Sequence, residues 1–302
     1  MLPELVHTYQ NHTLDSTRWN CYKPRPTDIV ISTSLKSGTT WTMEIVRQLI
    51  FLGQDAPQHH ATWLDNRWDP IDEKIAQLEA QPHRRLIKTH LPLDGLPFYP
   101  QVQYIVIGRD PRDVFMSLWN HHANMTADFR AFMNSARGPG DGALPPSPQD
   151  IHEYWALWIG RGWFPWESEG YPYWGNMHHI KTWWEYRFQP NILFVHYADM
   201  LADPGGEIQR IADFLAIPLP TPALPAVCEA VALDSMRRRA KAEGTRINQV
   251  WHGGADTFFF QGTNGRWRAV LSAAELALYE EKAAGMLTPE CRAWLEQGRV
   301  AG

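Results

Sequence analysis

A short polar loop near the beginning of the chain has the residue types of an anion-binding site. It follows an apolar run, precedes a helical pattern, and reads Lys36-Ser37-Gly38-Thr39-Thr40-Trp41. The N-terminus of a helix offers unpaired N–H groups and a positive dipole end, and Lys36 adds a full charge. Gly38 lets the backbone turn close to a ligand, and the hydroxyls around it can donate hydrogen bonds. The sequence therefore predicts that this loop binds a phosphate or a sulfate group.

The loop differs from the Walker A motif of P-loop kinases. GxxxxGK[ST] places its lysine after the second glycine, whereas here Lys36 precedes a single glycine. The spacing by itself also fits an ordinary turn between a strand and a helix that carries a surface lysine. Other segments of the chain decide between the two interpretations.

A second group of reactive side chains lies at the end of a predicted strand over 84–89. His90 follows this strand directly, and an imidazole that titrates near neutral pH suits a general base. Lys88 lies two residues earlier, so on an extended segment it projects to the same side as His90. Ligands of parallel sheets bind at the carboxyl ends of the strands. With 13 histidines in the chain, however, a single histidine after a strand is also compatible with a structural role.

Strands and helices alternate along the chain. Apolar runs predict buried strands at 28–32, 84–89, 102–107 and 191–195. Helical spacing predicts helices at 39–52, 70–80, 111–122, 204–215 and 273–284. Asp69 is expected to cap the helix that Pro70 opens. Such alternation is typical of an α/β fold in which helices flank a parallel sheet on both faces. We expect one domain over residues 1–302.

The region around 125–180 is expected to be an insertion that forms a lid or a ligand pocket. Its segment 136–149 is rich in glycine and proline, which predicts either a mobile lid or a plain surface loop. Many of the 15 tryptophans fall between Trp155 and Trp184. Because an indole N–H needs a partner when it is buried, such a cluster often lines a cavity.

Five segments in the same order resemble segments of the cytosolic-type sulfotransferase family. The chain resembles a bacterial-type member of that family. They span about 28–268 and lie at 36–41, 86–92, 104–113 with Ser117 beyond, 194–200 and 262–267. Each segment is weak or moderate alone, but five in register are specific. The resemblance implies a P-loop nucleotide-binding-like sulfotransferase fold. It also implies transfer of a sulfuryl group from 3′-phosphoadenosine-5′-phosphosulfate (PAPS) to a hydroxyl or amine of a small acceptor, with the 3′,5′-bisphosphate PAP as product.

The resemblance implies a role for each matching side chain. His90 corresponds to the general base, Lys36 to the main cation at the leaving oxygen, and Lys88 to a second cation at the sulfuryl group. The residues implied to bind the donor are Lys36, Ser37, Gly38, Thr39, Thr40, Trp41, Arg109, Ser117, Tyr197 and Gly262. Within this set, Arg109 and Ser117 correspond to the 3′-phosphate contacts and Trp41 to the residue that stacks on adenine. For Trp41, plain core packing is the alternative.

Two positions depart from the family pattern on the donor side. The family usually has Arg-Lys before the C-terminal glycine, whereas this chain has Phe260 and Gln261, so two cations of the 3′-phosphate pocket are missing. Leu233 takes the place of an aromatic residue on the second face of adenine. Either Arg266 or the tribasic run at 237–239 could compensate, although such a run also fits a solvated helix face.

The composition limits the other interpretations. A net charge of -5 and a pI near 6.2 argue against a general nucleic-acid binder. Three widely spaced cysteines form no zinc or redox motif, and the adjacent histidine pairs at 59/60, 121/122 and 178/179 do not have a metal-ligand spacing. No window approaches the ~18 apolar residues of a membrane span, and no secretory signal is recognisable. We therefore expect a cytoplasmic protein without a metal and without stable membrane insertion.

Two other functions stay open at this point. A P-loop-type small-molecule kinase would need Mg²⁺ and a carboxylate after an apolar strand, and no clean example of that pattern occurs. A non-catalytic nucleotide-binding protein would not need the combination of Lys36, Lys88 and His90. The sequence leaves the oligomeric state open. It also does not decide whether the acceptor is a phenol, a steroid-like alcohol, a lipid or a sugar. Trp163 and Trp166 are expected in the wall of the acceptor pocket, with plain core packing as the alternative.

Overall fold

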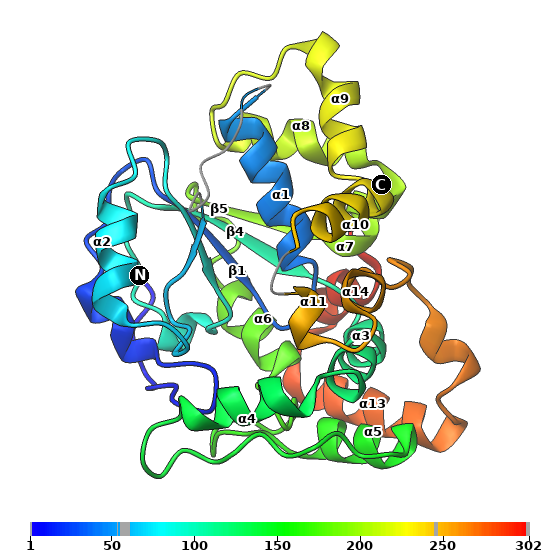
Figure 1. Ribbon diagram of the computed structural model, residues 1–302. Helices are drawn as coiled ribbons and strands as arrows, with labels where there is room; N and C mark the ends of the chain where they lie inside the picture. Colours follow the sequence, from blue (N-terminus) through cyan, green and yellow to red (C-terminus); the bar gives the residue numbers. More distant parts are fainter. Residues whose placement is uncertain (1, 53, 55–60, 245–246, 300–302) are drawn as a thin grey trace.

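The strands of the molecule form one parallel sheet. The computed structural model describes residues 2–52, 54, 61–244 and 247–299. In this part of the chain, five strands are arranged in the order β2-β3-β1-β4-β5 (Figure 1). Their bounds are Ile29–Thr33 (β1), Ala61–Trp63 (β2), Leu86–Thr89 (β3), Gln103–Gly108 (β4) and Ile192–His196 (β5).

All five residues of the central strand β1 are buried. Since alternate side chains of a strand point to opposite sides, both faces of β1 are covered. Ile29 and Ile31 pack into one apolar cluster, which includes Ile45 of helix α1 (Thr39–Ile50). Val30 packs into the other cluster with Phe115 of helix α3 (Pro111–Ala123). Each fully buried side chain of this kind contributes ~1.5–3 kcal/mol relative to an exposed one. The two clusters explain why the predicted strands read as continuous apolar runs.

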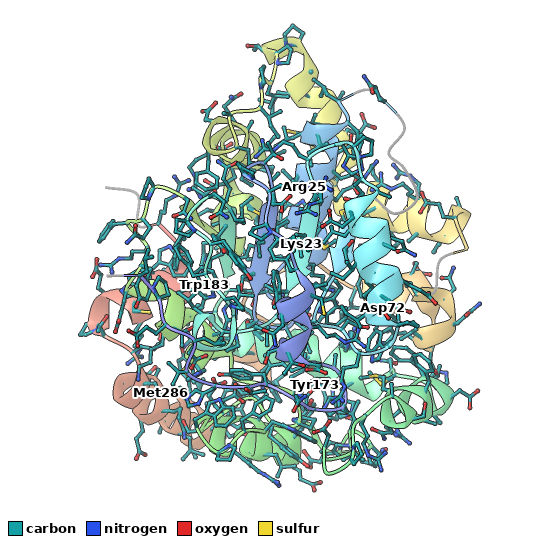
Figure 2. The ribbon with its side chains drawn as sticks, turned by 90° about the vertical axis from the view of Figure 1, so that its left-hand side faces the viewer. Lys23, Arg25, Asp72, Tyr173, Trp183 and Met286 are labelled. Atoms are coloured by element: carbon teal, nitrogen blue, oxygen red, sulfur yellow. The ribbon has the colours of Figure 1, made fainter. Side chains whose placement is uncertain are left out.

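Helices cover both faces of the sheet. On the side of Ile29 and Ile31 lie α1 (Thr39–Ile50), α8 (Pro204–Phe214) and α9 (Leu224–Ala230). On the side of Val30 lie α3 (Pro111–Ala123), α5 (Ile151–Gly160), α6 (Asn176–Trp184), α13 (Ala273–Met286) and α14 (Pro289–Gln297). Trp183 of α6 is fully buried inside this second layer (Figure 2).

The remaining helices lie around these two layers. They are α2 (Ile71–Glu79), α4 (Ala127–Ser135), α7 (Tyr197–Ala202), α10 (Leu233–Ala242), α11 (Ile247–Val250) and α12 (Gly254–Phe258). Four 3₁₀ turns complete the described chain at Ser16–Cys21, Leu93–Gly95, Thr221–Ala223 and Arg266–Ala269.

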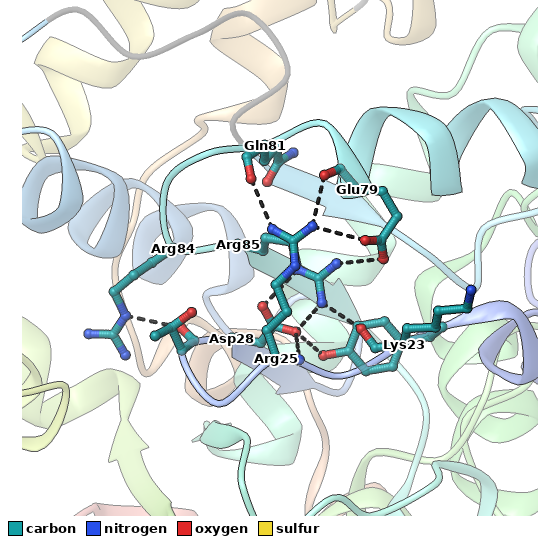
Figure 3. A network of polar contacts seen from close by, with 9 residues as sticks. Lys23, Arg25, Asp28, Glu79, Gln81, Arg84 and Arg85 are labelled. Atoms are coloured by element: carbon teal, nitrogen blue, oxygen red, sulfur yellow. Dashed lines mark hydrogen bonds and ion pairs between the residues drawn. The ribbon is translucent and has the colours of Figure 1, made fainter.

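A buried ion pair joins the amino ends of β1 and β3. Asp28 precedes β1 and Arg85 precedes β3, and both side chains are completely inaccessible to solvent. Arg85 Nε donates to Asp28 Oδ1 at 2.8 Å, and its Nη atoms reach Glu79 and the carbonyl of Lys23 (Figure 3). Pairing of Ile29 with Leu86 then places the carboxyl ends of the two strands side by side.

The predicted elements are present with small shifts at their ends. All four predicted strands and all five predicted helices are confirmed, and Asp110 caps α3 by accepting from the N–H of Arg112. The expected cap of α2 is wrong. Pro70 itself occupies the N-cap position, and Asp69 instead lies 3.6 Å from Lys74 as an ion pair. The edge strand β2 was not predicted, because three residues are too few to show a periodic pattern.

Candidate active site

A cavity of about 500 Å³ lies at the carboxyl edge of the sheet. Parallel pairing sets Ser32 of β1 beside Thr89 of β3, and Thr33 beside Ile107 of β4. The residues that follow these three strands therefore meet at one edge. All the site residues predicted from the sequence line this cavity, except Ser37.

The phosphate loop turns sharply into α1 on two residues with positive φ. Lys36 has φ 66° and Gly38 has φ 116°. A Cβ on Gly38 would lie 2.9 Å from the ring of Tyr197, so glycine is required both by the conformation and by the close approach. No side chain caps α1, which leaves the N–H groups of its first turn available to an anion.

Ser37 does not present its hydroxyl to the cavity. The side chain is fully buried and its Oγ lies 2.7 Å from Oγ of Ser34. Asn176 at the start of α6 donates to the same Ser34 oxygen. The predicted hydroxyl contact of Ser37 with a ligand is therefore corrected: the hydroxyl supports the loop from behind.

His90 has one ring nitrogen fixed and the other free. Its Nδ1 lies 2.8 Å from the carbonyl oxygen of Thr33. A carbonyl only accepts, so Nδ1 carries the proton and Nε2 is the bare nitrogen. Within the described residues, Nε2 has no hydrogen-bond partner. Burial, together with the charge of Lys88, holds the pKa of His90 well below its usual range. The ring is therefore neutral and able to accept a proton.

Two lysine ammonium groups lie in the same cavity without a carboxylate at ion-pair distance among the described residues. Burial, Arg109 and Lys88 lower the pKa of Lys36 to about 7. Burial also lowers the pKa of Lys88 to about 8. Lys88 Nζ lies 3.9 Å from the ring centroid of Trp63, and Lys36 Nζ lies 4.8 Å from that of Phe258. Crowded, desolvated cations of this kind favour an anionic ligand.

Arg109 joins the phosphate loop to the C-terminal loop. Its Nη1 donates to the carbonyl of Lys36 at 3.1 Å, and its Nη2 donates to the carbonyl of Thr263 at 3.0 Å. Its Nε donates to Oδ1 of Asn264, and the guanidinium stacks on the ring of Tyr197 at 4.0 Å. Three of the five N–H groups are thus used, which leaves two for a ligand.

The structure distinguishes the two arginine groups that could replace the missing cations. Arg266 lines the cavity, and its buried Nε has no partner in the described part of the chain. None of the three arginines at 237–239 lines the cavity. Arg237 donates to the carbonyl of Phe259, Arg238 donates to Ser235, and Arg239 pairs with Glu44 at 2.8 Å. The geometry therefore favours Arg266.

The aromatic residues of the donor half lie around the phosphate loop. Trp41 lines the cavity edge-on to Tyr197, with ring centroids 5.4 Å apart. Phe260 also lines the cavity, is 43% exposed, and lies 5.2 Å from the guanidinium of Arg266. Leu233, the departure from the family pattern, packs against Gly262. An apolar surface thus replaces the cationic one expected from the family.

The other half of the cavity is aromatic, but it does not contain the predicted tryptophans. Trp163 stacks on Tyr171, and Trp166 stacks on His7 of the N-terminal segment. Their expected place in the pocket wall is wrong, because the chain after α5 turns back onto the N-terminal segment. The wall is instead formed by Trp63, Trp68, Met125, Phe129, Met133, Tyr173, Trp174, Trp251 and Phe258.

The glycine- and proline-rich segment 136–149 contributes no residue to this cavity. It is a loop without helix or strand. Asn134 accepts from the N–H of Leu144 at 2.8 Å, and Arg67 pairs with Asp141. Of the two interpretations of this segment, the contacts fit a loop packed on the surface.

No pattern in the sequence pointed to His121 as part of the site. It lines the cavity from α3, and its Nδ1 lies 3.4 Å from Nζ of Lys36. The residue was visible only as half of a histidine pair, 121/122.

The histidine pair 59/60 lies outside the described residues. Elsewhere in the described ranges, no group of three or more potential metal ligands occurs. None of the described helices combines the length and the apolar character needed to cross a bilayer.

Comparisons with known proteins agree on one family. A model of the sulfotransferase domain matches residues 26–282. The glycolipid sulfotransferase of Mycobacterium bovis (strain BCG / Pasteur 1173P2) is 34% identical, over 96% of this chain and 94% of the relative. Sulfotransferase 1A1 of Rattus norvegicus is 28% identical, over 87% of this chain and 85% of the relative.

Solved structures share the fold. Mouse sulfotransferase SULT7A1 complexed with PAP has a TM-score of 0.70 at 19% identity and covers 97% of this chain and 98% of its own. Retinol dehydratase in complex with androsterone and PAP has a TM-score of 0.68 at 22% identity, over 90% of this chain and 84% of its own.

Proposed function

This chain belongs to the sulfotransferase domain family, and on that premise we propose that it moves the sulfuryl group of PAPS onto a hydroxyl of a small acceptor and releases PAP. The observation that carries the proposal is the meeting of His90, Lys36 and Lys88 in one cavity beside an uncapped helix N-terminus. A pocket that only bound a nucleotide would not need the neutral histidine. A kinase would not be expected to carry the sulfotransferase pattern over 26–282.

In the proposed reaction, the acceptor oxygen attacks sulfur while the bond from sulfur to the phosphate oxygen breaks. The bare Nε2 of His90 takes the proton of the acceptor hydroxyl, and the hydrogen bond from Nδ1 to Thr33 keeps the ring oriented. Lys36 donates to the leaving phosphate oxygen, where negative charge develops, and Lys88 donates to the sulfuryl oxygens. Because ammonium groups and the helix N-terminus supply the positive charge, the proposal includes no metal ion.

The donor is proposed to lie across the phosphate loop toward the C-terminal loop. The N–H groups at the start of α1 bind the 5′-phosphosulfate. Arg109, Ser117 and Arg266 bind the 3′-phosphate, since an arginine fork matches phosphate geometry. Trp41 and Tyr197 border the adenine. Binding of the anion raises the pKa of both lysines again, because an opposite charge stabilises the ammonium form.

The acceptor is proposed to be an amphipathic alcohol. Lysines and histidines lie at the reacting end of the cavity, and aromatic and methionine side chains line the wall next to them. The region 125–180, which we propose to be the acceptor-pocket insertion, contributes Met125 before α4, Phe129 and Met133 of α4, and Tyr173 and Trp174 before α6. The similarity to mycobacterial glycolipid sulfotransferases supports a glycolipid as the acceptor. The complex of retinol dehydratase with androsterone supports a steroid-like alcohol as the alternative.

A screen of acceptors tests the proposal. The enzyme is incubated with PAPS and a set of glycolipids, sterols, phenols and sugars, and mass spectrometry detects PAP and the sulfated product. Acceptor-dependent release of PAP in the presence of EDTA is the expected result. Tight PAP binding with no product from any class would indicate a binding protein. EDTA-sensitive turnover of ATP would indicate a kinase.

A further inference from the structure

His121 is the histidine of the cavity for which the proposed chemistry has no use. It lies in the last turn of α3 and is half-buried. Its backbone carbonyl accepts from Nε1 of Trp251 at 3.0 Å, and its ring packs on the ring of Trp251 with centroids 4.6 Å apart. The Nδ1 atom lies 3.4 Å from Nζ of Lys36. The ring is therefore held between the reacting cations and the aromatic wall.

These contacts assign the tautomer of His121. The ammonium of Lys36 can only donate, so Nδ1 of His121 is the accepting nitrogen and the ring proton is on Nε2. Burial and the charge of Lys36 keep the pKa of His121 well below its usual range, so the ring stays neutral. Nε2 has no hydrogen-bond partner within the described ranges of the chain. The ring thus offers one N–H donor that the protein itself does not use.

The position of this donor relates it to the acceptor. His121 is close enough to Lys36, Lys88 and His90 for all three to influence its titration. It borders Trp251 on the acceptor wall, whereas the residues that surround Arg109 lie in the donor half. Asn120, the preceding polar residue of α3, already donates to the carbonyl of Thr257. A group that binds Nε2 of His121 would therefore lie next to the acceptor oxygen that is sulfated.

We propose that His121 binds a second hydroxyl of the acceptor, adjacent to the one that is sulfated, and thereby selects sugar-like polyols over simple alcohols with the same apolar tail. This inference rests on the proposed function and specifies its acceptor class. The rings of Trp63, Trp174 and Trp251 in the wall provide apolar surface for the C–H groups of a sugar ring. A site that hydrogen-bonds a substrate hydroxyl discriminates against an analogue without it, because the partner in the site is left unpaired.

The test compares octyl glucoside with octanol as acceptors in the presence of PAPS. The quantity measured is the ratio of kcat/KM for octyl glucoside to kcat/KM for octanol. His121→Phe keeps an aromatic ring against Trp251 but removes the donor, so the ratio should fall about tenfold, as expected for one lost hydrogen bond. His121→Gln retains an N–H donor and should recover part of the ratio. His152→Phe is the matched control, because His152 pairs with Glu275 and does not line the cavity. It should leave the ratio within about twofold.

Three results would contradict the proposal. An equal loss of kcat/KM for both acceptors in His121→Phe means that His121 acts through Lys36. No loss of kcat/KM for octyl glucoside means that His121 binds no hydroxyl.

PAP affinity and the thermal transition of each variant show whether the donor site and the fold are intact. Calorimetry with PAP bound gives a readout without turnover: the wild type should bind octyl glucoside more tightly than octanol, and His121→Phe should abolish the difference. Equal binding by the wild type overturns the inference, whereas selective binding without sulfation counts against the proposed function alone.

Discussion

At the scale of single residues, the site is a set of buried titratable groups whose protonation is determined by their surroundings. The carbonyl of Thr33 assigns the tautomer of His90, and burial keeps that ring neutral. Lys36 and Lys88 have pKa values lowered toward neutrality, mainly by burial. A neutral base beside desolvated cations is the combination that attack by a hydroxyl on a charged donor requires.

The role of His90 is tested by its removal. His90→Ala should lower kcat by ~10²-fold or more, because no other described group of the cavity has a bare nitrogen fixed in this way. PAP affinity should change little, since the ring is assigned to the acceptor. Steady-state kinetics and calorimetry give the two values. A kcat like that of the wild type would remove His90 from the mechanism.

The lysines make donor binding depend on pH. In the free enzyme, the pKa of Lys36 is about 7 and that of Lys88 about 8. Below these values the ammonium forms are already present, and above them PAP binding must take up protons. PAP affinity should therefore be highest at about pH 6–7, since the phosphate groups of PAP lose charge below about pH 6. It should fall between pH 7 and 9, by up to about tenfold per unit for each group. Calorimetry in buffers of different ionisation enthalpy measures the proton uptake.

The control for this pH dependence is Lys36→Met. This variant should bind PAP more weakly and should show a smaller fall in affinity between pH 7 and 9. If the wild type and the variant have the same pH dependence, Lys36 does not titrate in this range.

At the scale of elements, β1 and β3 carry the site at their carboxyl ends and a buried ion pair at their amino ends. The Arg85–Asp28 pair fixes the two strands at their amino ends, and the phosphate loop and His90 follow their carboxyl ends. A slip of one residue would point Lys88 to the other face of the sheet. Asn176 of α6 supports the phosphate loop by donating a hydrogen bond to Ser34.

Loss of this buried pair should destabilise the fold. Arg85→Met leaves Asp28 as an uncompensated buried charge, and the free energy of unfolding should fall by about 3–5 kcal/mol. Arg25→Met is the matched control, because Arg25 forms a partly exposed pair with Glu79 in the same network (Figure 3). Its effect should stay below about 1 kcal/mol. Chemical denaturation measures both, and equal effects would show that the buried pair has no special role.

At the scale of the whole molecule, the donor site joins parts of the chain that are far apart in sequence. Arg109 contacts both the phosphate loop and the loop after Gly262, and Arg266 lies beside it. The two cations of the family pattern at 260 and 261 are absent, because this chain has Phe260 and Gln261 there. The structure offers Arg266 instead, and its unpartnered Nε is available to a phosphate.

Arg266 should contribute to binding of the 3′-phosphate. Arg266→Gln should weaken PAP binding about tenfold or more, as expected for a hydrogen bond to a charged group. Affinity for adenosine 5′-monophosphate, which has no 3′-phosphate, should not change. Arg238→Gln is the matched control, since Arg238 contacts Ser235 outside the cavity. An equal loss for both nucleotides would assign Arg266 to another part of the donor.

The sequence alone determined the parts of this protein that are local. Apolar runs and helical spacing predicted the strands and helices around the site, because burial on both sheet faces produces continuous apolar runs. The loop from Lys36 to Trp41 and the segment ending in His90 showed their chemistry through residue types at fixed offsets. Since both follow parallel strands, their meeting at one edge was also predictable.

Only the tertiary structure decided which other side chains join them. Trp163 and Trp166 were expected in the pocket, yet they pack on Tyr171 and the N-terminal segment, whereas Trp63 and Trp251 form the wall. Likewise, the structure favours Arg266 over 237–239 and brings His121 to Lys36. Periodicity shows whether a side chain is buried, but not against which distant segment. That choice is made by the packing of helices and loops that no local pattern encodes.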